Sequence, residues 1–376
     1  MKITLQKEIP WHAKEGDLVL PFFEGEDFSR AWKGAPEPLR EEMARVQEKK
    51  DFSGKLHEVY CSYALKKGSR VLVVGLGSKK EFSLSRFGQA IGVAAAFLQS
   101  KKTPCASIAP SSSLQTLASV RDLSLWIAKS ALIAMYQFNS FKSDAKKEAS
   151  DEPSIGICGL EAKDMKRAEE GFREGEILGR AVNHTREYGN LPSNHATPQY
   201  LVSRAKELAK QYKNLSVKIF HKEDMEHLGM GGILGVSKGS PEEPAFIILE
   251  WRGGKKSEPP VCLVGKAITF DSGGISIKPR QNLDEMKFDM SGGGTVLGAL
   301  EAVAALGLQK NVIGLIPACE NMPGGNSYKP GDILATYGGK TIEVVDTDAE
   351  GRIVLADALA YAKELKPRAV IDLATL

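Results

Sequence analysis

The chain has 376 residues and a formal net charge of +3, with 42% hydrophobic and 26% charged residues. This composition is that of an ordinary globular protein, and the length predicts two domains because single domains seldom exceed about 250–300 residues. The weak, dispersed charge gives no reason to expect a nucleic-acid partner, and no apolar run is long enough to span a membrane.

Residues 1–23 contain no apolar segment of the kind found in secretory signal peptides. The five cysteines are scattered and have no C-x-x-C spacing, so we expect most of them to be buried thiols in a reducing compartment. Together these features predict a cytoplasmic protein.

Short apolar runs rich in β-branched residues recur along the chain and predict strands. They are residues 70–77, 154–160, 216–222, 245–251, 261–266, 311–319, 341–346 and 369–376. Helical patterns, such as 199–213 and 295–306, separate many of them. This alternation predicts an α/β fold with a mixed, largely parallel sheet flanked by helices.

The polar segment 141–154 is typical of an interdomain linker, and the charged amphipathic pattern at 161–189 predicts a long helix. We therefore expect a smaller N-terminal α/β domain at 1–150, a linker and connecting helix at 151–189, and a second domain at 190–376.

Several common catalytic motifs are missing. GLGSKK at 75–80 follows a predicted strand but has Lys80 where a dinucleotide-binding loop needs its third glycine. No G-x-x-x-x-G-K-[ST], H-E-x-x-H or G-x-S-x-G sequence occurs, which argues against the usual NTPase, zinc-protease and serine-hydrolase classes. The six histidines also lack a metal-ligand spacing.

Three carboxylates alternate just beyond the predicted strand at 341–346: Asp346, Asp348 and Glu350. Side chains at i and i+2 of an extended segment project to the same side, so these groups would repel one another unless cations or donors compensate. One interpretation is a solvated acidic turn at the start of the next helix, where negative charge is favourable. The other is a cation site.

A second polar segment favours the cation site. Lys266 ends a predicted strand, and Asp271, Lys278 and Asp289 follow it among glycine pairs. Each of these could be a loop residue by itself, but two acid-bearing loops at strand ends of one sheet favour a joint site. Carboxylates without cysteine or clustered histidine suit hard or borderline divalent cations, and two such ions would balance four carboxylates.

The two segments together resemble the leucyl aminopeptidase family, also called cytosol aminopeptidase. DTDAEGRIVLADAL (346–359) and VGKAITFDSGGISIKP (264–279) are similar to its two metal-binding segments, and ENMPGGNSYKPGDI (320–333) and MGGILGVSKGSPEEP (230–244) also resemble it. The resemblance covers residues from about 170 to 376, and the N-terminal part is similar to the family's smaller domain only loosely.

The resemblance implies a two-metal aminopeptidase, with Mn²⁺ or Zn²⁺ as the ions. It implies that five residues bind the metals: Lys266, Asp271, Asp289, Asp348 and Glu350. Lys266 would bind as the neutral amine, Lys278 would stabilise the developing oxyanion, and Arg352 would hold a bicarbonate that acts as general base.

The substrates implied are peptides with a free N-terminus, whose amino group binds one metal and whose first residue is Leu or another apolar residue. Met286, Thr375 and Leu376 match positions that contact the substrate. The family resemblance also implies a homohexamer, without a membrane or nucleic-acid partner.

The sequence departs from the family pattern at two places. Asp346 stands where the family generally has Asn. Family members continue past the position of Leu376 and complete the catalytic sheet there, so we expect this chain to be C-terminally truncated and, alone, poorly active.

Two alternatives remain open at this stage. The first is a non-catalytic oligomeric DNA-binding or regulatory protein on the same fold. The second is a two-metal phosphoesterase, although no arginine cluster for a phosphate is evident.

Overall fold

The computed structural model describes residues 3–11, 16–32, 34–65, 69–143 and 154–376. The chain divides into two compact units, Met1–Asn183 and His184–Leu376. Most of the predicted linker at 141–154 lies outside the described residues. The predicted connecting helix is present as α6 (Met165–Asn190), which runs through the point of division.

The first unit contains a six-stranded sheet of order β1-β6-β5-β2-β4-β3, in which only β3 is antiparallel to its neighbour. Its strands are β1 (Ile3–Leu5), β2 (Asp17–Phe22), β3 (Val59–Ser62), β4 (Val71–Gly75), β5 (Cys105–Ile108) and β6 (Ser154–Ile157). Because β6 pairs with β1 and β5, this sheet extends beyond the expected domain boundary at residue 150.

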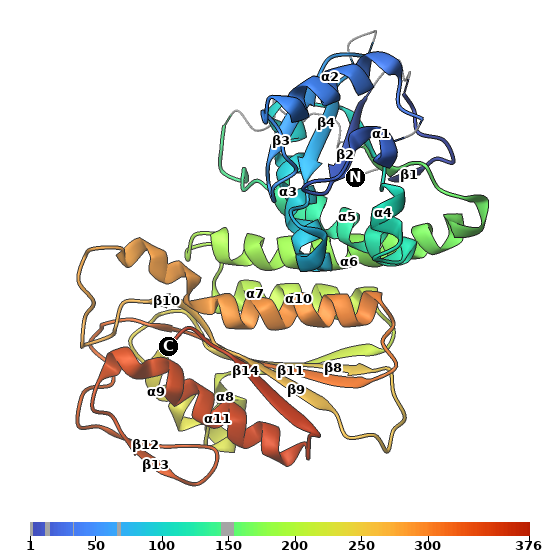
Figure 1. Cartoon of the computed structure of the whole chain (residues 1–376). Helices are drawn as coiled ribbons and strands as arrows, with labels where there is room; N and C mark the ends of the chain where they lie inside the picture. The colour runs from blue at the N-terminus through green and yellow to red at the C-terminus, as the bar shows by residue number, and fades with distance from the viewer. Residues whose placement is uncertain (1–2, 12–15, 33, 66–68, 144–153) are drawn as a thin grey trace. The chain divides into compact units, whose positions relative to one another are not determined.

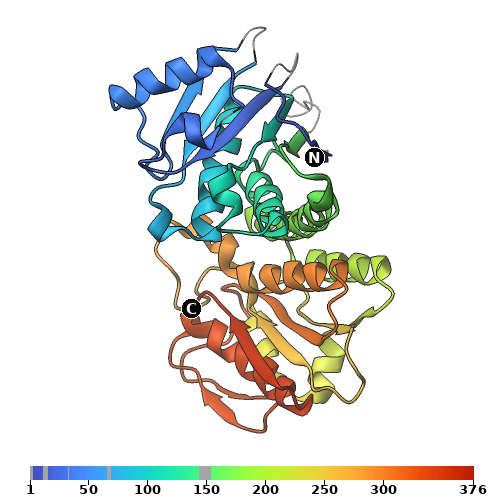
Figure 2. The same ribbon diagram turned by 45° about the vertical axis from the view of Figure 1, so that its right-hand side comes forward.

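Helices cover both faces of this sheet (Figure 2). They are α1 (Phe28–Ala31), α2 (Glu37–Glu48), α3 (Leu84–Ser100), α4 (Ser112–Gln115) and α5 (Val120–Ala134), with short 3₁₀ turns η1 (Lys79–Glu81) and η2 (Ala162–Asp164). Alternate residues of β2 enter different cores: Val19 packs with α3 and α5, whereas Leu18 and Leu20 pack with α2. This two-sided burial explains why β4 and all of β2 after Asp17 are apolar.

A buried ion pair joins β2 to the residue before β4. Arg70 donates to Asp17 from Nε at 3.1 Å and from its terminal nitrogen at 2.7 Å, and the Thr103 hydroxyl donates to the same carboxylate at 2.6 Å. Burial alone would raise the pKa of Asp17, but these hydrogen bonds hold it below its usual value. The ionised carboxylate therefore stabilises the first unit.

We expect Asp17→Asn to lower the free energy of unfolding of the first unit by about 3 kcal/mol at pH 7, because Arg70 loses its buried partner. The folded pKa of Asp17 lies below the unfolded value of about 3.9, so its contribution is present above about pH 4 and is lost as the pH falls through the folded pKa. Urea unfolding followed by tryptophan fluorescence, at pH 7 and below pH 4, measures the difference in unfolding free energy. Three of the four tryptophans, Trp11, Trp32 and Trp126, lie in the first unit, and Trp251 lies in the second.

The matched control is Asp332→Asn, which removes a half-buried carboxylate paired with Lys329 in the second unit. This change should leave the unfolding of the first unit as it is. If the difference in unfolding free energy between the wild type and Asp17→Asn stayed constant with pH, the electrostatic explanation would be contradicted.

The second unit contains a mixed sheet, as predicted. Its strands are β7 (Leu215–Phe220), β8 (Ala245–Arg252), β9 (Val261–Gly265), β10 (Ala267–Asp271), β11 (Asn311–Asn321) and β14 (Ala369–Leu373), in the order β14-β9-β11-β8-β7 with β10 also paired to β11. The pairs β14–β9, β9–β11 and β10–β11 are parallel, whereas β11–β8 and β8–β7 are antiparallel. A separate hairpin consists of β12 (Ile333–Ala335) and β13 (Thr341–Glu343).

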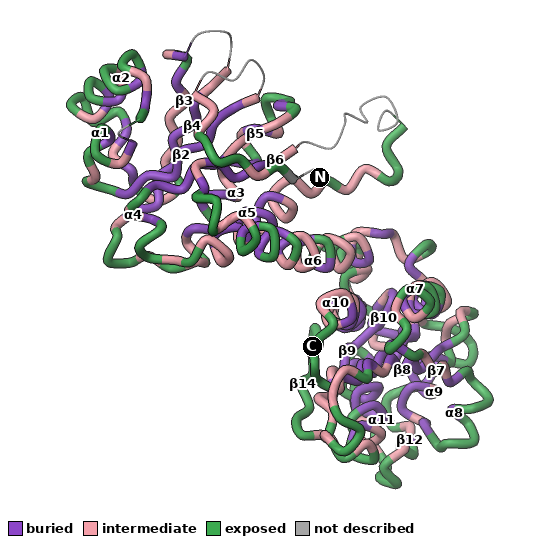
Figure 3. The backbone as a smooth tube through the Cα atoms, turned by 90° about the vertical axis from the view of Figure 1, so that its right-hand side faces the viewer, coloured by how far each residue is buried: buried purple, intermediate pink, exposed green. Residues whose placement is uncertain are grey.

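Helices α7 (Pro198–Gln211) and α10 (Ser291–Ala305) cover one face of this sheet, and α8 (Lys222–Leu228), α9 (Gly231–Ser237) and α11 (Glu350–Glu364) cover the other (Figure 1). The strands β8, β9 and β11 between these layers are largely buried (Figure 3). Residues of β8 alternate between the two cores: Ile247 packs with α7 and α10, and Ile248 with α9 and α11.

Three cysteines, Cys158, Cys262 and Cys319, are buried, in agreement with the expectation that most would be. Among the described residues, no helix has the length and apolar character needed to cross a membrane.

Candidate active site

Two lysines and four carboxylates of the second unit meet at the carboxyl ends of its parallel strands. Lys266 directly follows β9, and its Nζ lies 2.8 Å from Asp289 Oδ1 and 2.7 Å from Glu350 Oε1. Lys278 Nζ lies 2.9 Å from Asp271 Oδ2 and 2.5 Å from Asp348 Oδ1. Each lysine thus joins carboxylates from different segments of the chain.

Burial strongly affects the ionisation of these groups. It raises the pKa of Glu350 to about 7, with a further contribution from Asp271, and it also raises the pKa of Asp289. Burial alone would lower the pKa values of Lys266 and Lys278, but the carboxylates that face them raise both. The site is therefore a compact set of opposite charges held largely away from water.

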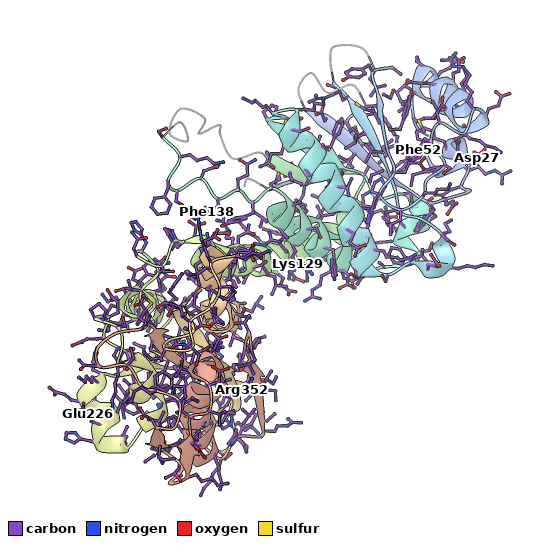
Figure 4. All side chains as sticks on the ribbon, turned by 90° about the vertical axis from the view of Figure 1, so that its left-hand side faces the viewer. Asp27, Phe52, Lys129, Phe138, Glu226 and Arg352 are labelled. Atoms are coloured by element: carbon purple, nitrogen blue, oxygen red, sulfur yellow. The ribbon has the colours of Figure 1, made fainter. Side chains whose placement is uncertain are left out.

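All ten residues that the sequence predicts as site residues line one cavity of about 570 Å³. They are Lys266, Asp271, Lys278, Met286, Asp289, Asp348, Glu350, Arg352, Thr375 and Leu376. Arg352 lies near the start of α11 in the second unit, as Figure 4 shows. The structure thus brings the predicted metal ligands, the two predicted catalytic residues and the predicted substrate contacts together.

Local structure explains how the acidic segments reach the cavity. Asp271 ends β10, and the chain then turns through Gly273 and Gly274, whose φ angles of 85° and 68° favour glycine. Asp289 comes from the 3₁₀ segment η3 (Leu283–Met290) and Asp348 from η4 (Thr347–Ala349). A Cβ atom at Gly351 would lie 2.7 Å from Lys266 Nζ, so a larger residue there would displace the Lys266 side chain from its present position.

Asp346, the departure from the family pattern, has a local structural role. It is exposed, does not line the cavity, and accepts a hydrogen bond from the Asp348 backbone N–H at 2.9 Å. This bond, together with one from Ser276, lowers the pKa of Asp346. Asp346 thereby caps the turn that carries Asp348.

The model of the cytosol aminopeptidase family's catalytic domain matches residues 183–376, and the model of its N-terminal domain matches residues 19–145. The chain belongs to the cytosol aminopeptidase family.

Relatives of this family cover nearly the whole chain. A probable cytosol aminopeptidase of Nitrosococcus oceani is 40% identical, over 100% of this chain and 75% of its own length. A structure of mutant tomato leucine aminopeptidase is 30% identical with a TM-score of 0.84, and the match covers 100% of this chain and 74% of that one. The bottromycin maturation enzyme BotP in complex with Mn is 26% identical with a TM-score of 0.78, and the match covers 96% of this chain and 72% of that one.

These matches decide the class of activity. The protein is a metal-dependent aminopeptidase, a hydrolase that acts at the N-termini of peptides. The alternative of a non-catalytic DNA-binding or regulatory protein is not favoured.

The chemistry of the residues fits the metal dependence of the family. Asp271, Asp348 and Glu350 each offer a carboxylate oxygen within 4.8 Å of the others. Within the part of the chain that the structure describes, Asp289 Oδ2 is buried without a hydrogen-bond partner. An acceptor oxygen buried without a donor has a free-energy cost, which a bound cation would remove.

Three residues of the site's surroundings escaped the sequence analysis: Asn321, Tyr328 and Thr347. Thr347 Oγ1 donates to Gly273 O at 2.7 Å, which joins the two acid-bearing segments. Asn321 and Tyr328 both donate to Thr347 O, at 2.9 and 2.8 Å. The only signal for Asn321 and Tyr328 was their place in the family-like segment 320–333, in which no single residue stood out.

Proposed function

We propose that this aminopeptidase holds two divalent cations, Mn²⁺ or Zn²⁺, in the cavity at the ends of β9 and β10. The ligands are Lys266, Asp271, Asp289, Asp348 and Glu350. The cluster of carboxylate oxygens within 4.8 Å is the observation that carries the proposal, because oxygen ligands at this density suit divalent cations. Lys266 joins the ligand set as the neutral amine, so its proton leaves when the ions bind.

When bound, the two ions would supply Lewis acidity and an activated water as the nucleophile for the scissile carbonyl. Lys278 is the group of the chain that stabilises the oxyanion, because its ammonium lies within the same cavity and 80% of its side-chain surface is buried. Arg352 holds a bicarbonate, since a guanidinium offers paired donors to a planar oxyanion. That bicarbonate is the proposed general base.

The substrates we propose are peptides with a free N-terminus and an apolar first residue such as Leu. Met286 and Phe288 line the cavity beside the charged groups and offer apolar contact to that side chain. Thr375 and Leu376 line the same cavity, which supports their proposed role as substrate contacts. The family relationship also supports a cytoplasmic homohexamer, which light scattering after size-exclusion chromatography tests.

The test of this function compares leucine amide with N-acetyl-leucine amide, each with Mn²⁺ and bicarbonate present. We expect slow turnover of leucine amide and none of N-acetyl-leucine amide, because the free amine is part of the recognition. Turnover of both substrates would overturn the role of the amine. Turnover that is unchanged after exhaustive chelation would overturn the metal centre.

A further inference from the structure

Asn321 is a buried amide at the end of β11, directly behind the proposed metal centre. It is 0% exposed and does not line the cavity. Its Nδ2 donates to Asp271 Oδ1 at 2.8 Å and to Thr347 O at 2.9 Å, and it lies 3.4 Å from Glu350 Oε2. All three neighbours are acceptors, which fixes the orientation of the amide with its nitrogen toward them.

These contacts restrict the carboxylate of Asp271. Its Oδ1 accepts hydrogen bonds from Asn321 and from the Gly273 backbone N–H at 2.9 Å, while its Oδ2 faces Lys278 in the cavity. The two donors on one oxygen fix the rotation of the carboxylate and leave the other oxygen directed into the site. The longer contact to Glu350 Oε2 places a second proposed ligand next to the same amide nitrogen.

We propose that Asn321 is a positioning residue for the metal centre, in which one buried amide orients the carboxylates of both Asp271 and Glu350. The inference rests on the proposed metal centre and deepens it. Partners of this kind, which hold the ligands rather than the ion, set the orientation of ligands and commonly control metal affinity.

The chemistry of the position favours an amide over other side chains. Aspartate would add a further carboxylate and no donor, a hydroxyl would provide only one donor, and leucine none. Asn321 Oδ1, by contrast, is buried without a hydrogen-bond partner among the described residues. The position therefore keeps an unsatisfied acceptor, which is unfavourable, in exchange for two N–H donors, whose shortest contacts are to Asp271 Oδ1 and Thr347 O.

Tyr328 provides a matched control from the same network. Its hydroxyl is buried and donates to Thr347 O at 2.8 Å, the same carbonyl that Asn321 contacts. It donates to neither Asp271 nor Glu350. If Asn321 served only to hold the Thr347 segment, Tyr328→Phe and a donor-free variant of Asn321 would have similar effects.

The experiment titrates Mn²⁺ into metal-free protein and measures the free ion by electron paramagnetic resonance. We expect Asn321→Leu to weaken Mn²⁺ binding by about 10–100-fold, and Tyr328→Phe to change it by no more than about two- to threefold. Unfolding temperatures of the metal-free variants check that each is folded. If Asn321→Leu is unfolded, Asn321→Ser takes its place, and the one remaining donor should give a smaller loss.

Three results would overturn the proposal. Wild-type affinity in the folded Asn321 variant would disprove the positioning role while leaving the metal centre intact. An equal loss in Tyr328→Phe would assign the effect to the Thr347 segment instead. No Mn²⁺ binding by the wild type would disprove the proposed centre itself, and with it this inference.

Discussion

Replacing Asp348 with alanine should abolish the hydrolysis of leucine amide, with kcat/KM lower by about 10³-fold or more, since loss of a metal ligand exceeds the 10–100-fold effect of losing a ligand's partner. Asp348 is one of the three carboxylates that lie within 4.8 Å of one another. Its side chain is 34% exposed, so its removal should leave the fold intact. Steady-state kinetics and Mn²⁺ titration of the same preparation measure the change.

Asp346→Asn is the matched control for this variant. Residue 346 is an exposed carboxylate two positions away that does not line the cavity, and asparagine keeps the oxygen that accepts from the Asp348 N–H. We expect kcat/KM to change by no more than about two- to threefold. Asp348→Ala with normal Mn²⁺ affinity and normal turnover would contradict the proposed ligand set.

Lys278→Met should lower kcat by about 10²–10³-fold with little change in KM, as is typical when a donor to a developing oxyanion is lost. The methionine side chain is unbranched and reaches as far as the lysine Cε, but it lacks the ammonium. In the structure this ammonium lies between Asp271 and Asp348, close to the proposed ions and within the cavity.

The control for Lys278 is Lys329→Met, which removes a lysine paired with Asp332 on the surface. It should leave both kcat and KM within about two- to threefold of the wild type. If Lys278→Met instead raised KM and left kcat unchanged, Lys278 would contribute equally to substrate and transition-state binding, and the proposed role would be wrong.

The strands that the sequence predicted are the long or uniformly apolar ones. RVLVVGLG contains β4, and β8, β9 and β11 of the second unit follow runs of the same kind. β2 and β5 were missed although they lie in the middle of the first sheet, because DLVLPF contains a proline and CASI has only four residues. β10 was missed because only Lys266 separates it from β9.

The position of the domain boundary could not be predicted from local composition alone. The polar segment at 141–154 predicts a boundary near residue 150, yet β6 follows it and pairs with β1 and β5 in the first sheet. Parallel pairing joins strands that are distant along the chain, so no local pattern reports which sheet a strand enters. The compact units divide at residue 183 instead.

Asp357 shows the same limit inside the second unit. The sequence places one aspartate among the apolar residues of α11, where a solvated side chain would be the ordinary expectation. In the structure Asp357 is fully buried and accepts hydrogen bonds from the backbone N–H groups of Ile233, at 2.9 Å, and Tyr337, at 2.8 Å. The carboxylate thus joins α11 to α9 and to the β12–β13 hairpin.

The sequence by itself determined which residues are candidates for the site. Two short segments resemble the metal-binding segments of the cytosol aminopeptidases in residue types and spacing, and this resemblance is specific. Only the tertiary structure decided how those residues pair: Lys266 with Asp289 and Glu350, and Lys278 with Asp271 and Asp348. It alone revealed Asn321 behind two of them. The physical reason is that ion pairs and hydrogen bonds depend on distances of a few ångströms between strand ends, which the packing of the sheet sets and local spacing does not.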